Sequence, residues 1–366
     1  MTLTRVGVKM KECDCDFILP TKEGWEQHYD NCISKWNSTA QYPKNEDGSI
    51  RLTNKNLTKL HQDFIYHLGL DTASYDLKAM FGDVKFVCMG GTKYRMKEFA
   101  KHMAKVLNIK DFEAKNLSKH SHRYAMYKVG PIISVNHGIG ISSMTILLQE
   151  ILKVLYYAKA KNPIIFRIGT SGGLKIPPGS IVISSWGLNG ILEKTYDLPV
   201  LGEIRKLPSV FDKRLIQELE SMVTEGDGFN TYSGGTMAAD DFYRGQARLD
   251  GPFCDYKEED KLAFLHRLSA LGVKNIEMEA TAFAAMTKEA GVRAADVCVT
   301  ILDRLNGDQV TPDKELLLKF QERPMILVKN IMKIFLFDLH FIYQGSVHRK
   351  KKTNYFFLVI SISVNY

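Results

Sequence analysis

The 366-residue sequence contains no stretch that approaches the roughly 20 consecutive apolar residues with which an α-helix crosses a bilayer. Its first residues include lysines but no apolar segment of the kind found in secretory signals. Cysteines are few and dispersed: Cys13, Cys15, Cys32, Cys88, Cys254 and Cys298. This distribution argues against a disulfide scaffold and is typical of a reducing compartment. We therefore expect a cytoplasmic protein with no membrane partner.

Nucleotide-binding signatures are also absent. The sequence has neither a phosphate loop of the Walker type nor a dinucleotide fingerprint, and no pair of aspartates is placed to hold magnesium. Charge does not indicate a nucleic-acid partner, because 49 basic and 41 acidic residues are interspersed and leave a net charge of only +8. These absences favour a small-molecule substrate and predict no nucleic acid, no metal and no cofactor.

Alternating helix and strand patterns predict one large α/β domain at residues 56–332. Apolar residues make up 45% of the chain, which is enough to bury a full core. Strands are expected at 84–89, 124–129, 131–136, 162–168, 180–185, 230–233 and 294–302, and helices at 95–107, 142–158, 213–223, 258–271, 279–291 and from about 312. This order predicts a three-layer αβα architecture with a central mixed, mostly parallel sheet. Ligands of such sheets usually bind beyond the carboxyl ends of the strands.

The two ends of the chain differ from this domain. Residues 1–55 form a polar N-terminal extension, in which Cys13, Cys15, His28 and Cys32 resemble part of a zinc-finger pattern. A single residue between the first two cysteines is poor spacing for a zinc knuckle, so a zinc site and a disordered leader both stay open. Residues 333–366 form an apolar and basic tail. Its composition is compatible with a nuclear signal, a membrane-surface contact, an accessory strand or a non-native extension.

Two glycine-rich segments each contain an arginine and follow an apolar strand. Residues 167–173 read Arg-Ile-Gly-Thr-Ser-Gly-Gly, and residues 90–95 read Gly-Gly-Thr-Lys-Tyr-Arg and begin a helix. Glycine lets backbone N–H groups approach an anion, a helix N-terminus favours negative charge, and a guanidinium matches an oxyanion. Taken alone, each segment is also compatible with a simple turn. Together they indicate a site for free phosphate.

Four segments, in this order along the chain, resemble the uridine phosphorylases of animals, a nucleoside phosphorylase family. They are Ser-Val-Asn-His-Gly-Ile-Gly at 134–140, Phe-Arg-Ile-Gly-Thr-Ser-Gly-Gly at 166–173, Asp-Phe-Tyr-Arg-Gly-Gln-Ala-Arg-Leu-Asp-Gly at 241–251 and Asn-Ile-Glu-Met-Glu at 275–279. The similarity extends over roughly residues 60–330. It implies a nucleoside phosphorylase fold and the reversible phosphorolysis of uridine to uracil and α-D-ribose 1-phosphate, with inorganic phosphate as co-substrate.

The resemblance also implies roles for individual residues. Phosphate is expected against Gly91, Arg95, Arg123, Arg167 and Thr170. Uridine is expected against His67, Ser171, Gly172, Phe242, Gln246, Arg248, Met278, Glu279, Ile301 and Leu302. Among these, the implied catalytic residues are Gln246 and Arg248, which would stabilise the departing uracil, and Glu279, which would accept hydrogen bonds from ribose. A homodimer is implied as well, with His67 and Arg123 reaching the active site of the neighbouring subunit.

Three other functions remain open. A purine nucleoside phosphorylase would share the phosphate segments, and Asp240 stands where the purine enzymes carry an acid. The pair Gln246 and Arg248 favours a pyrimidine instead, because an amide and a guanidinium match its N3–C4–O4 edge. A nucleosidase that uses water would not need three arginines for phosphate. A non-catalytic nucleoside-binding homologue is the third alternative.

Several of these residues also have a purely structural interpretation. Glu279 is expected to begin a helix, where a carboxylate favours the helix dipole. His67 is compatible with an ordinary surface position, and Met278 and Phe242 with core positions. The sequence also departs from the family pattern in the bulky residues at 92–94 and in Ala247, which stands in place of a glycine. Both departures are expected to alter loop stiffness more than chemistry.

Overall fold

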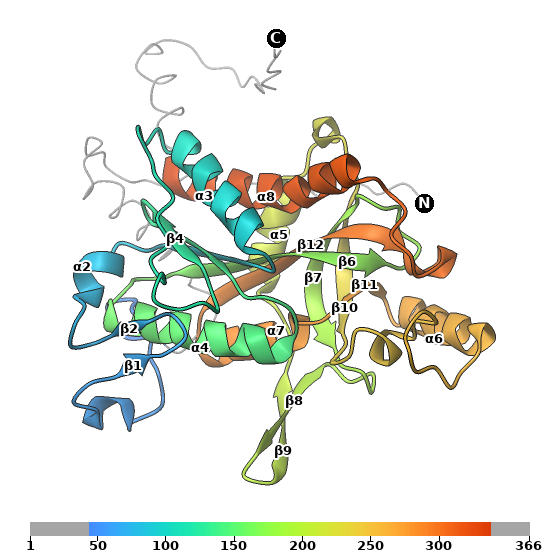
Figure 1. Ribbon diagram of the computed structural model, residues 1–366, viewed down its shortest axis with the longest axis horizontal. Coiled ribbons are helices and arrows are strands. Elements are labelled where there is room, and N and C mark those ends of the chain that lie inside the picture. The colour runs from blue at the N-terminus through green and yellow to red at the C-terminus, as the bar shows by residue number, and fades with distance from the viewer. Residues whose placement is uncertain (1–43, 338–366) are drawn as a thin grey trace, which may run out of the picture.

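The computed structural model describes residues 44–337 (Figure 1). The candidate zinc ligands Cys13, Cys15, His28 and Cys32 and the tail from residue 338 onward therefore lie outside the described residues. Within the described range, no helix is both long enough and apolar enough to cross a membrane.

Eight strands form the central sheet: β3 (Phe86–Gly90), β4 (Met126–Val129), β5 (Ile132–Asn136), β6 (Ile164–Gly173), β7 (Ile181–Leu188), β10 (Thr231–Ala238), β11 (Val273–Glu277) and β12 (Arg293–Asp303). Their spatial order is β11-β10-β7-β12-β6-β3-β5-β4, and β11 also pairs with the end of β6. Neighbouring strands are parallel except for β4–β5, β7–β12 and β11–β6. The predicted mixed, mostly parallel sheet is confirmed. The extra pairing of β11 closes β6, β12, β7, β10 and β11 into a small barrel.

Helices cover both faces of this sheet, which confirms the three layers (Figure 1). The helices are α2 (Leu77–Phe81), α3 (Lys93–Val106), α4 (Ile141–Tyr157), α5 (Lys213–Ser221), α6 (Glu258–Ala270), α7 (Ala280–Glu289) and α8 (Lys314–Phe337). One face carries α3, α5 and α8, whereas α4 and α7 pack together on the other. Two small antiparallel pairs lie outside the sheet: β1 (Phe64–Ile65) with β2 (Leu70–Asp71), and β8 (Thr195–Val200) with β9 (Glu203–Pro208).

For the glycine-rich segment 167–173, the sequence left a simple turn open as an alternative. The segment is instead the continuation of β6. Its residues pair with β12 on one side and with β3 and then β11 on the other. Glycine is needed here because the neighbours come close: a Cβ at Gly169 would lie 2.7 Å from Cys298 Sγ, and one at Gly172 would lie 2.7 Å from Cγ of Arg304. The glycines therefore make room for side chains and do not reverse the chain.

The sequence analysis missed β8, β9 and β11. The β8–β9 hairpin projects away from the sheet (Figure 1) and is at least partly exposed along its length, so it has no apolar face to reveal it. Strand β11 is buried but contains Asn275 and Glu277 among its apolar residues. Buried polar side chains in a short strand break the apolar pattern on which strand prediction depends.

The domain extends beyond the predicted limits of 56 and 332 on both sides. Before residue 56, Ser49 forms a bridge to Lys161, and Ser49 and Ile50 are buried. At the other end, α8 continues to Phe337 and buries Phe335 against Phe86 of β3.

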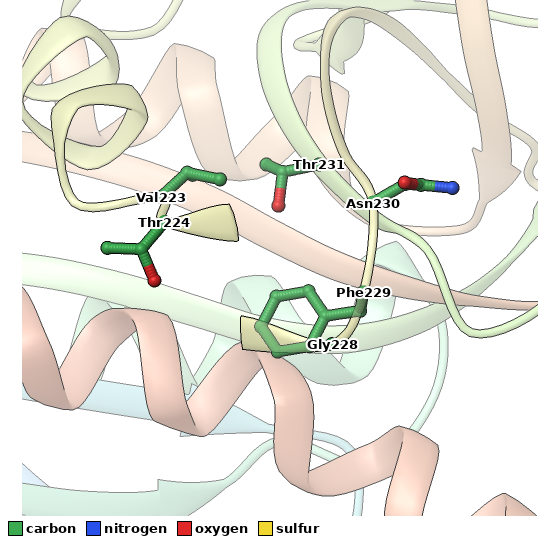
Figure 2. Close-up of a pocket in the computed structure, with 6 residues that line it drawn as sticks. All are labelled: Val223, Thr224, Gly228, Phe229, Asn230 and Thr231. Atoms are coloured by element: carbon green, nitrogen blue, oxygen red, sulfur yellow. The ribbon is translucent and has the colours of Figure 1, made fainter. Parts of the chain in front are cut away.

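A depression with a volume of about 600 Å³ lies at the start of β10 (Figure 2). It is lined by Val223, Thr224, Gly228, Phe229, Asn230 and Thr231. None of these side chains titrates. The depression also lies at the amino end of a strand, whereas ligands of this kind of sheet bind at the carboxyl ends. It is therefore a poor candidate for the active site.

The barrel leaves no room for a side chain at Gly235 of β10, where a Cβ would overlap the indole ring of Trp186. We expect Gly235→Ala to reduce the free energy of unfolding by about 1–3 kcal/mol, the usual cost of overpacking. Among residues 44–337, no atom lies within 4 Å of the Cβ position of Gly190, so Gly190→Ala is the matched control and should be neutral or slightly stabilising. Urea denaturation measures both. Equal stability of the two variants would contradict the packing argument.

Candidate active site

Arg167 of β6 lies at the centre of a buried cluster of carboxylates. Its Nη1 donates to Asp296 Oδ1 of β12 at 2.7 Å, and its Nη2 contacts Glu277 Oε2 at 2.8 Å and also Glu279. The guanidinium is almost fully buried. Burial alone lowers the pKa of Arg167, but the three carboxylates outweigh it and hold that pKa well above its usual value. Arg167 is thus a permanent cation, placed below the carboxyl end of β3.

The two glutamates of this cluster have different tasks. Glu277 accepts the backbone N–H groups of Glu279 at 2.8 Å and of Ala280 at 3.0 Å, so it is Glu277 that caps α7. The side chain of Glu279 makes no cap bond and instead accepts the N–H of Gly140 at 2.5 Å. The capping interpretation of Glu279 was therefore wrong. The sequence analysis missed Glu277, although it stands two residues before Glu279 in the same motif.

The pKa values of the two glutamates move in opposite directions. Burial, only partly opposed by Arg167, raises the pKa of Glu277 well above its usual value and favours its protonated form. Burial also raises the pKa of Glu279, but Arg167, His137 and the hydrogen bond from the N–H of Gly140 together outweigh burial, so the pKa is lowered. Glu279 is consequently the ionised member of the pair and an acceptor for hydrogen bonds.

The turn from β3 to α3 brings a second arginine to this cluster. Gly90 ends β3, and the hydroxyl of Thr92 caps α3 by accepting the N–H of Arg95 at 3.3 Å. The guanidinium of Arg95 is buried and donates to Gln321 Oε1 at 2.9 Å and to the carbonyl of Ile168 at 3.5 Å. Burial, with the nearby charge of Arg167, lowers the pKa of Arg95 to about 10, which leaves it positive at neutral pH.

His137 lies between these two arginines and Glu279. It is 1% exposed, and its backbone N–H donates to the carbonyl of Gly90 at 2.8 Å. Burial lowers its pKa to about 3, and the positive charges of Arg167 and Arg95 add to this effect, so the imidazole is neutral at neutral pH. Among the described residues, neither ring nitrogen has a hydrogen-bond partner, and the same is true of the buried Nε atoms of Arg95 and Arg167. Several buried polar nitrogens are thus free to bind an oxyanion here.

A second group of predicted residues comes together around Gln246, at the end of a short 3-10 turn, η4 (Arg244–Gln246). Arg304 donates to the side-chain oxygen of Gln246 at 3.3 Å and to its carbonyl at 2.8 Å, and so orients the amide. Arg248 donates to both carboxylate oxygens of Asp250 at 2.8 and 2.6 Å. Its guanidinium lies 4.6 Å from the ring centroid of Phe242. Phe242 is 44% exposed and is therefore not a core residue.

Arg304 is a residue that the sequence analysis did not assign. It is almost fully buried, with its Nε on Asp308 Oδ1 at 3.1 Å. The available signal was its place at the carboxyl end of β12, where polar residues of such sheets collect. Ala247, the departure from the family pattern, has a φ of 53°. This left-handed conformation strains alanine more than glycine.

Four of the remaining nucleoside residues lie on β6, which also carries Arg167, and on the neighbouring strand β12. Ser171 and Gly172 belong to β6, and Ile301 and Leu302 belong to the neighbouring β12, where Leu302 is the register partner of Gly172. Thr170 is half-buried on β6, and Met278, also half-buried, lies between the two glutamates in sequence. The structure thus places these residues at the carboxyl ends of adjacent strands.

His67 and Arg123 lie at a different part of the subunit. The ring of His67 donates from Nδ1 to Glu150 Oε1 at 2.7 Å, and its centroid lies 6.3 Å from that of Tyr124, the residue after Arg123. Glu150 also accepts the backbone N–H groups of His67 and Leu68, each at 2.9 Å. Glu279 accepts the N–H of Gly140 at the start of α4, and Glu150 stands ten residues further along that helix. About 15 Å of helix therefore separates Glu150 from Glu279. His67 is partly exposed, and Arg123 is exposed.

The pKa of His137 makes a prediction for stability against pH. An unfolded histidine titrates near 6.5, whereas folded His137 titrates at about 3, so below pH 6.5 the unfolded chain binds a proton that the folded chain does not. Stability is therefore lost as the pH falls, by about 2 kcal/mol between pH 7 and pH 5 from this residue. His137→Asn should remove this part of the pH dependence in urea denaturation without phosphate. The exposed His120, changed to Asn, should leave the slope unchanged; an unaltered slope in His137→Asn would contradict the assignment.

Comparison with known proteins identifies the family. The family model of the phosphorylase superfamily matches residues 85–336. A curated relative from Caenorhabditis elegans, named uridine and thymidine phosphorylase, is 46% identical over 284 residues, which cover 77% of this chain and 95% of the relative. The crystal structure of uridine phosphorylase from Schistosoma mansoni in complex with uracil is 40% identical, with a TM-score of 0.73 over 77% of this chain and 98% of that one. Another Schistosoma mansoni relative, 38% identical over 77% of this chain and 95% of its own, is named inactive uridine phosphorylase B. The chain belongs to the phosphorylase superfamily, among the uridine phosphorylases.

Proposed function

We propose that the protein catalyses the reversible phosphorolysis of uridine to uracil and α-D-ribose 1-phosphate. The observation that carries this proposal is the cluster of buried nitrogens of Arg95, Arg167 and His137 that have no partner among the described residues. Buried polar groups in proteins are nearly always hydrogen-bonded, so such a cluster indicates a ligand. Two cations beside a helix N-terminus select an oxyanion, and phosphate is the oxyanion that the family uses.

In this proposal Arg95, Arg167, Thr170 and the backbone at Gly91 hold phosphate below the carboxyl end of β3. Phosphate attacks C1′ of the nucleoside while the bond from C1′ to N1 of uracil breaks, and the electron pair of that bond leaves with uracil. Positive charge develops on the ribose ring, which the phosphate dianion stabilises. No protein nucleophile and no cofactor are needed. The protein contributes placement and electrostatic stabilisation.

The group around Gln246 binds the base. Its amide and the guanidinium of Arg248 meet the polar edge of uracil, and Phe242 stacks on the ring. Negative charge grows on uracil as it departs, and loss of one such donor typically slows a reaction by about 10²–10³-fold. Ribose lies over Met278, and Glu279 accepts its hydroxyl hydrogens. Ionised Glu279 suits this role, because a carboxylate has only acceptor sites.

The proposed enzyme is a homodimer in which His67 and Arg123 complete the site of the other copy. Supporting this, large apolar side chains are exposed beside His67: Phe64 is 57% exposed and Tyr66 is 78% exposed. Ile139, 76% exposed, precedes the start of α4, which packs against β1. A second copy would cover this surface. We also propose a cytoplasmic location, which is supported by Cys88, Cys254 and Cys298, each a free thiol in the described part of the chain.

The first test is phosphate-dependent release of uracil from uridine, followed by absorbance or chromatography. We expect release with phosphate and none without it, and uridine cleaved faster than inosine. Release that does not need phosphate would favour a nucleosidase, and faster cleavage of inosine would favour the purine enzyme. No turnover by the full chain or by residues 44–337 would leave only a non-catalytic homologue.

A second test addresses the phosphate site. Arg95 makes no ion pair in the described subunit that its loss would break, so Arg95→Gln should preserve the fold. Charge-assisted hydrogen bonds contribute about 1.5–3 kcal/mol, so we expect the KM for phosphate to rise about 10–100-fold. The KM for uridine should change much less. Arg205→Gln, on the exposed strand β9, is the matched control. An unchanged KM for phosphate in Arg95→Gln would remove this residue from the site.

A further inference from the structure

A continuous row of buried polar side chains links Arg167 to Ser171 through the strands of the barrel. Arg167 Nη1 donates to Asp296 Oδ1 at 2.7 Å, and Asp296 Oδ2 accepts the hydroxyl of Ser184 at 3.0 Å. Ser184 Oγ lies 2.6 Å from Thr236 Oγ1, which lies 2.7 Å from the side-chain oxygen of Asn275. The amide nitrogen of Asn275 lies 3.0 Å from Ser171 Oγ. All of these side chains are buried.

The row follows the barrel from strand to strand. Asp296 lies on β12, Ser184 on β7, Thr236 on β10 and Asn275 on β11, in the spatial order of those strands. Both ends lie on β6, where Arg167 belongs to the predicted phosphate site and Ser171 to the predicted nucleoside site. The row is therefore a physical connection between the two halves of the proposed active site.

The number of available protons fixes the direction of the hydrogen bonds. Ser184 and Thr236 have one hydroxyl proton each, yet they take part in three close contacts. Asp296 forms an ion pair with Arg167, and a carboxylate can only accept, so Ser184 must donate to it. Thr236 must then donate to Ser184, because the 2.6 Å contact needs a proton. Nothing remains for Thr236 to donate to Asn275.

Asn275 must therefore donate to Thr236, which requires its amide nitrogen on that side. A rotation of the amide by about 180° exchanges its nitrogen and oxygen and keeps both distances. The oxygen then faces Ser171 and accepts its hydroxyl proton. Every bond in the row now points from Ser171 toward Asp296.

We infer that Asp296 is a positioning residue for nucleoside binding: through Ser184, Thr236 and Asn275 it turns the hydroxyl proton of Ser171 into the protein. Both lone pairs of Ser171 then remain for the substrate. This inference rests on the proposed function. It means that the hydroxyl oxygen of Ser171 can only accept hydrogen bonds from the ribose, where positive charge grows in the transition state. A row of hydrogen bonds that ends on a carboxylate also polarises each member in the same sense.

Asp296→Asn reverses the row without breaking it. The new amide can accept from Arg167 and donate to Ser184, which donates to Thr236, which donates to the oxygen of Asn275. The amide nitrogen of Asn275 then donates to Ser171, whose proton turns to the carbonyl of Val299, 3.2 Å away. Side-chain size and hydrogen-bond partners are retained. If Asp296 had only a structural role at the nucleoside end, this change would therefore leave kcat/KM for uridine unaltered.

The test is a double-mutant cycle measured as kcat/KM for uridine at saturating phosphate, which removes any effect on phosphate affinity. We expect Asp296→Asn to lower kcat/KM about 3–10-fold, a coupling of the size found within hydrogen-bond networks. Thr236→Val cuts the row in the middle. In that background, Asp296→Asn should have less than about half of its single effect on the logarithm of kcat/KM.

Thr287→Val is the matched control, because Thr287 is a buried threonine of α7 whose hydroxyl bonds only within its helix, to the carbonyls of Phe283 and Ala284. The effects of Thr287→Val and Asp296→Asn on kcat/KM should be independent, so that the double variant shows the product of the two. If Thr236→Val fails to fold, Ser184→Ala cuts the row one step nearer to Asp296 and replaces it. If the effects of Asp296→Asn and of Thr236→Val (or Ser184→Ala) on kcat/KM are independent and simply multiply, the inference is overturned.

Failure of the proposed function is separable from failure of this inference. If the wild-type chain releases no uracil, the same cycle is measured on the free energy of unfolding, because a connected row also couples the stability effects of its members. Coupling with Thr236→Val but not with Thr287→Val then supports the row. Additive stability effects would overturn it.

Discussion

The buried charge of Arg167 is the interaction on which the rest of the site depends. Moving a guanidinium out of water costs several kcal/mol, which only well-placed anions offset. Here the anions are Asp296 on β12 and Glu279 in the turn between β11 and α7. Glu277 also caps α7, and Glu279 also holds the start of α4 through Gly140. One cation on β6 therefore fixes the ends of two helices as well as the orientation of the carboxylates that face the substrate.

This arrangement is possible because β6 is unusually well enclosed. It pairs with β12 along its whole length on one side, and with β3 and then β11 on the other, which closes the barrel. Its glycines let Cys298 and Arg304 approach the backbone, so large side chains from β12 and the turn after it fill the space beside the strand. The same closure joins one polar side chain from each of β12, β7, β10 and β11, and two from β6, into a single hydrogen-bonded row. Fold and site thus share one set of contacts.

The sequence predicted the parts of the fold that depend on local apolar patterns. Strands such as β3 and β5 are buried over their whole length, and the turn at Gly90 begins α3 as expected. It failed where the decisive interaction is remote: residues 167–173 look like a loop because glycines favour turns, but here pairing with β12 and β11 overrides that tendency. Glu277 and Arg304 were missed for a related reason. Their partners in the site are far away in sequence, because Glu277 contacts Arg167 and Arg304 contacts Gln246, and no spacing rule brings such groups together.

Charge balance connects the proposed site to assembly. Within one subunit, Arg95 and Arg167 provide two positive charges, and Asp296 and Glu279 provide two negative ones. Glu277, whose pKa is raised by burial, favours the neutral form and adds no charge. A phosphate dianion would therefore enter a buried site with no net positive charge, where its loss of hydration is poorly offset. In the proposed dimer, Arg123 from the second copy would add one positive charge in a region of low dielectric, where each charge counts heavily. By linkage, phosphate binding and association of the proposed dimer would then favour one another.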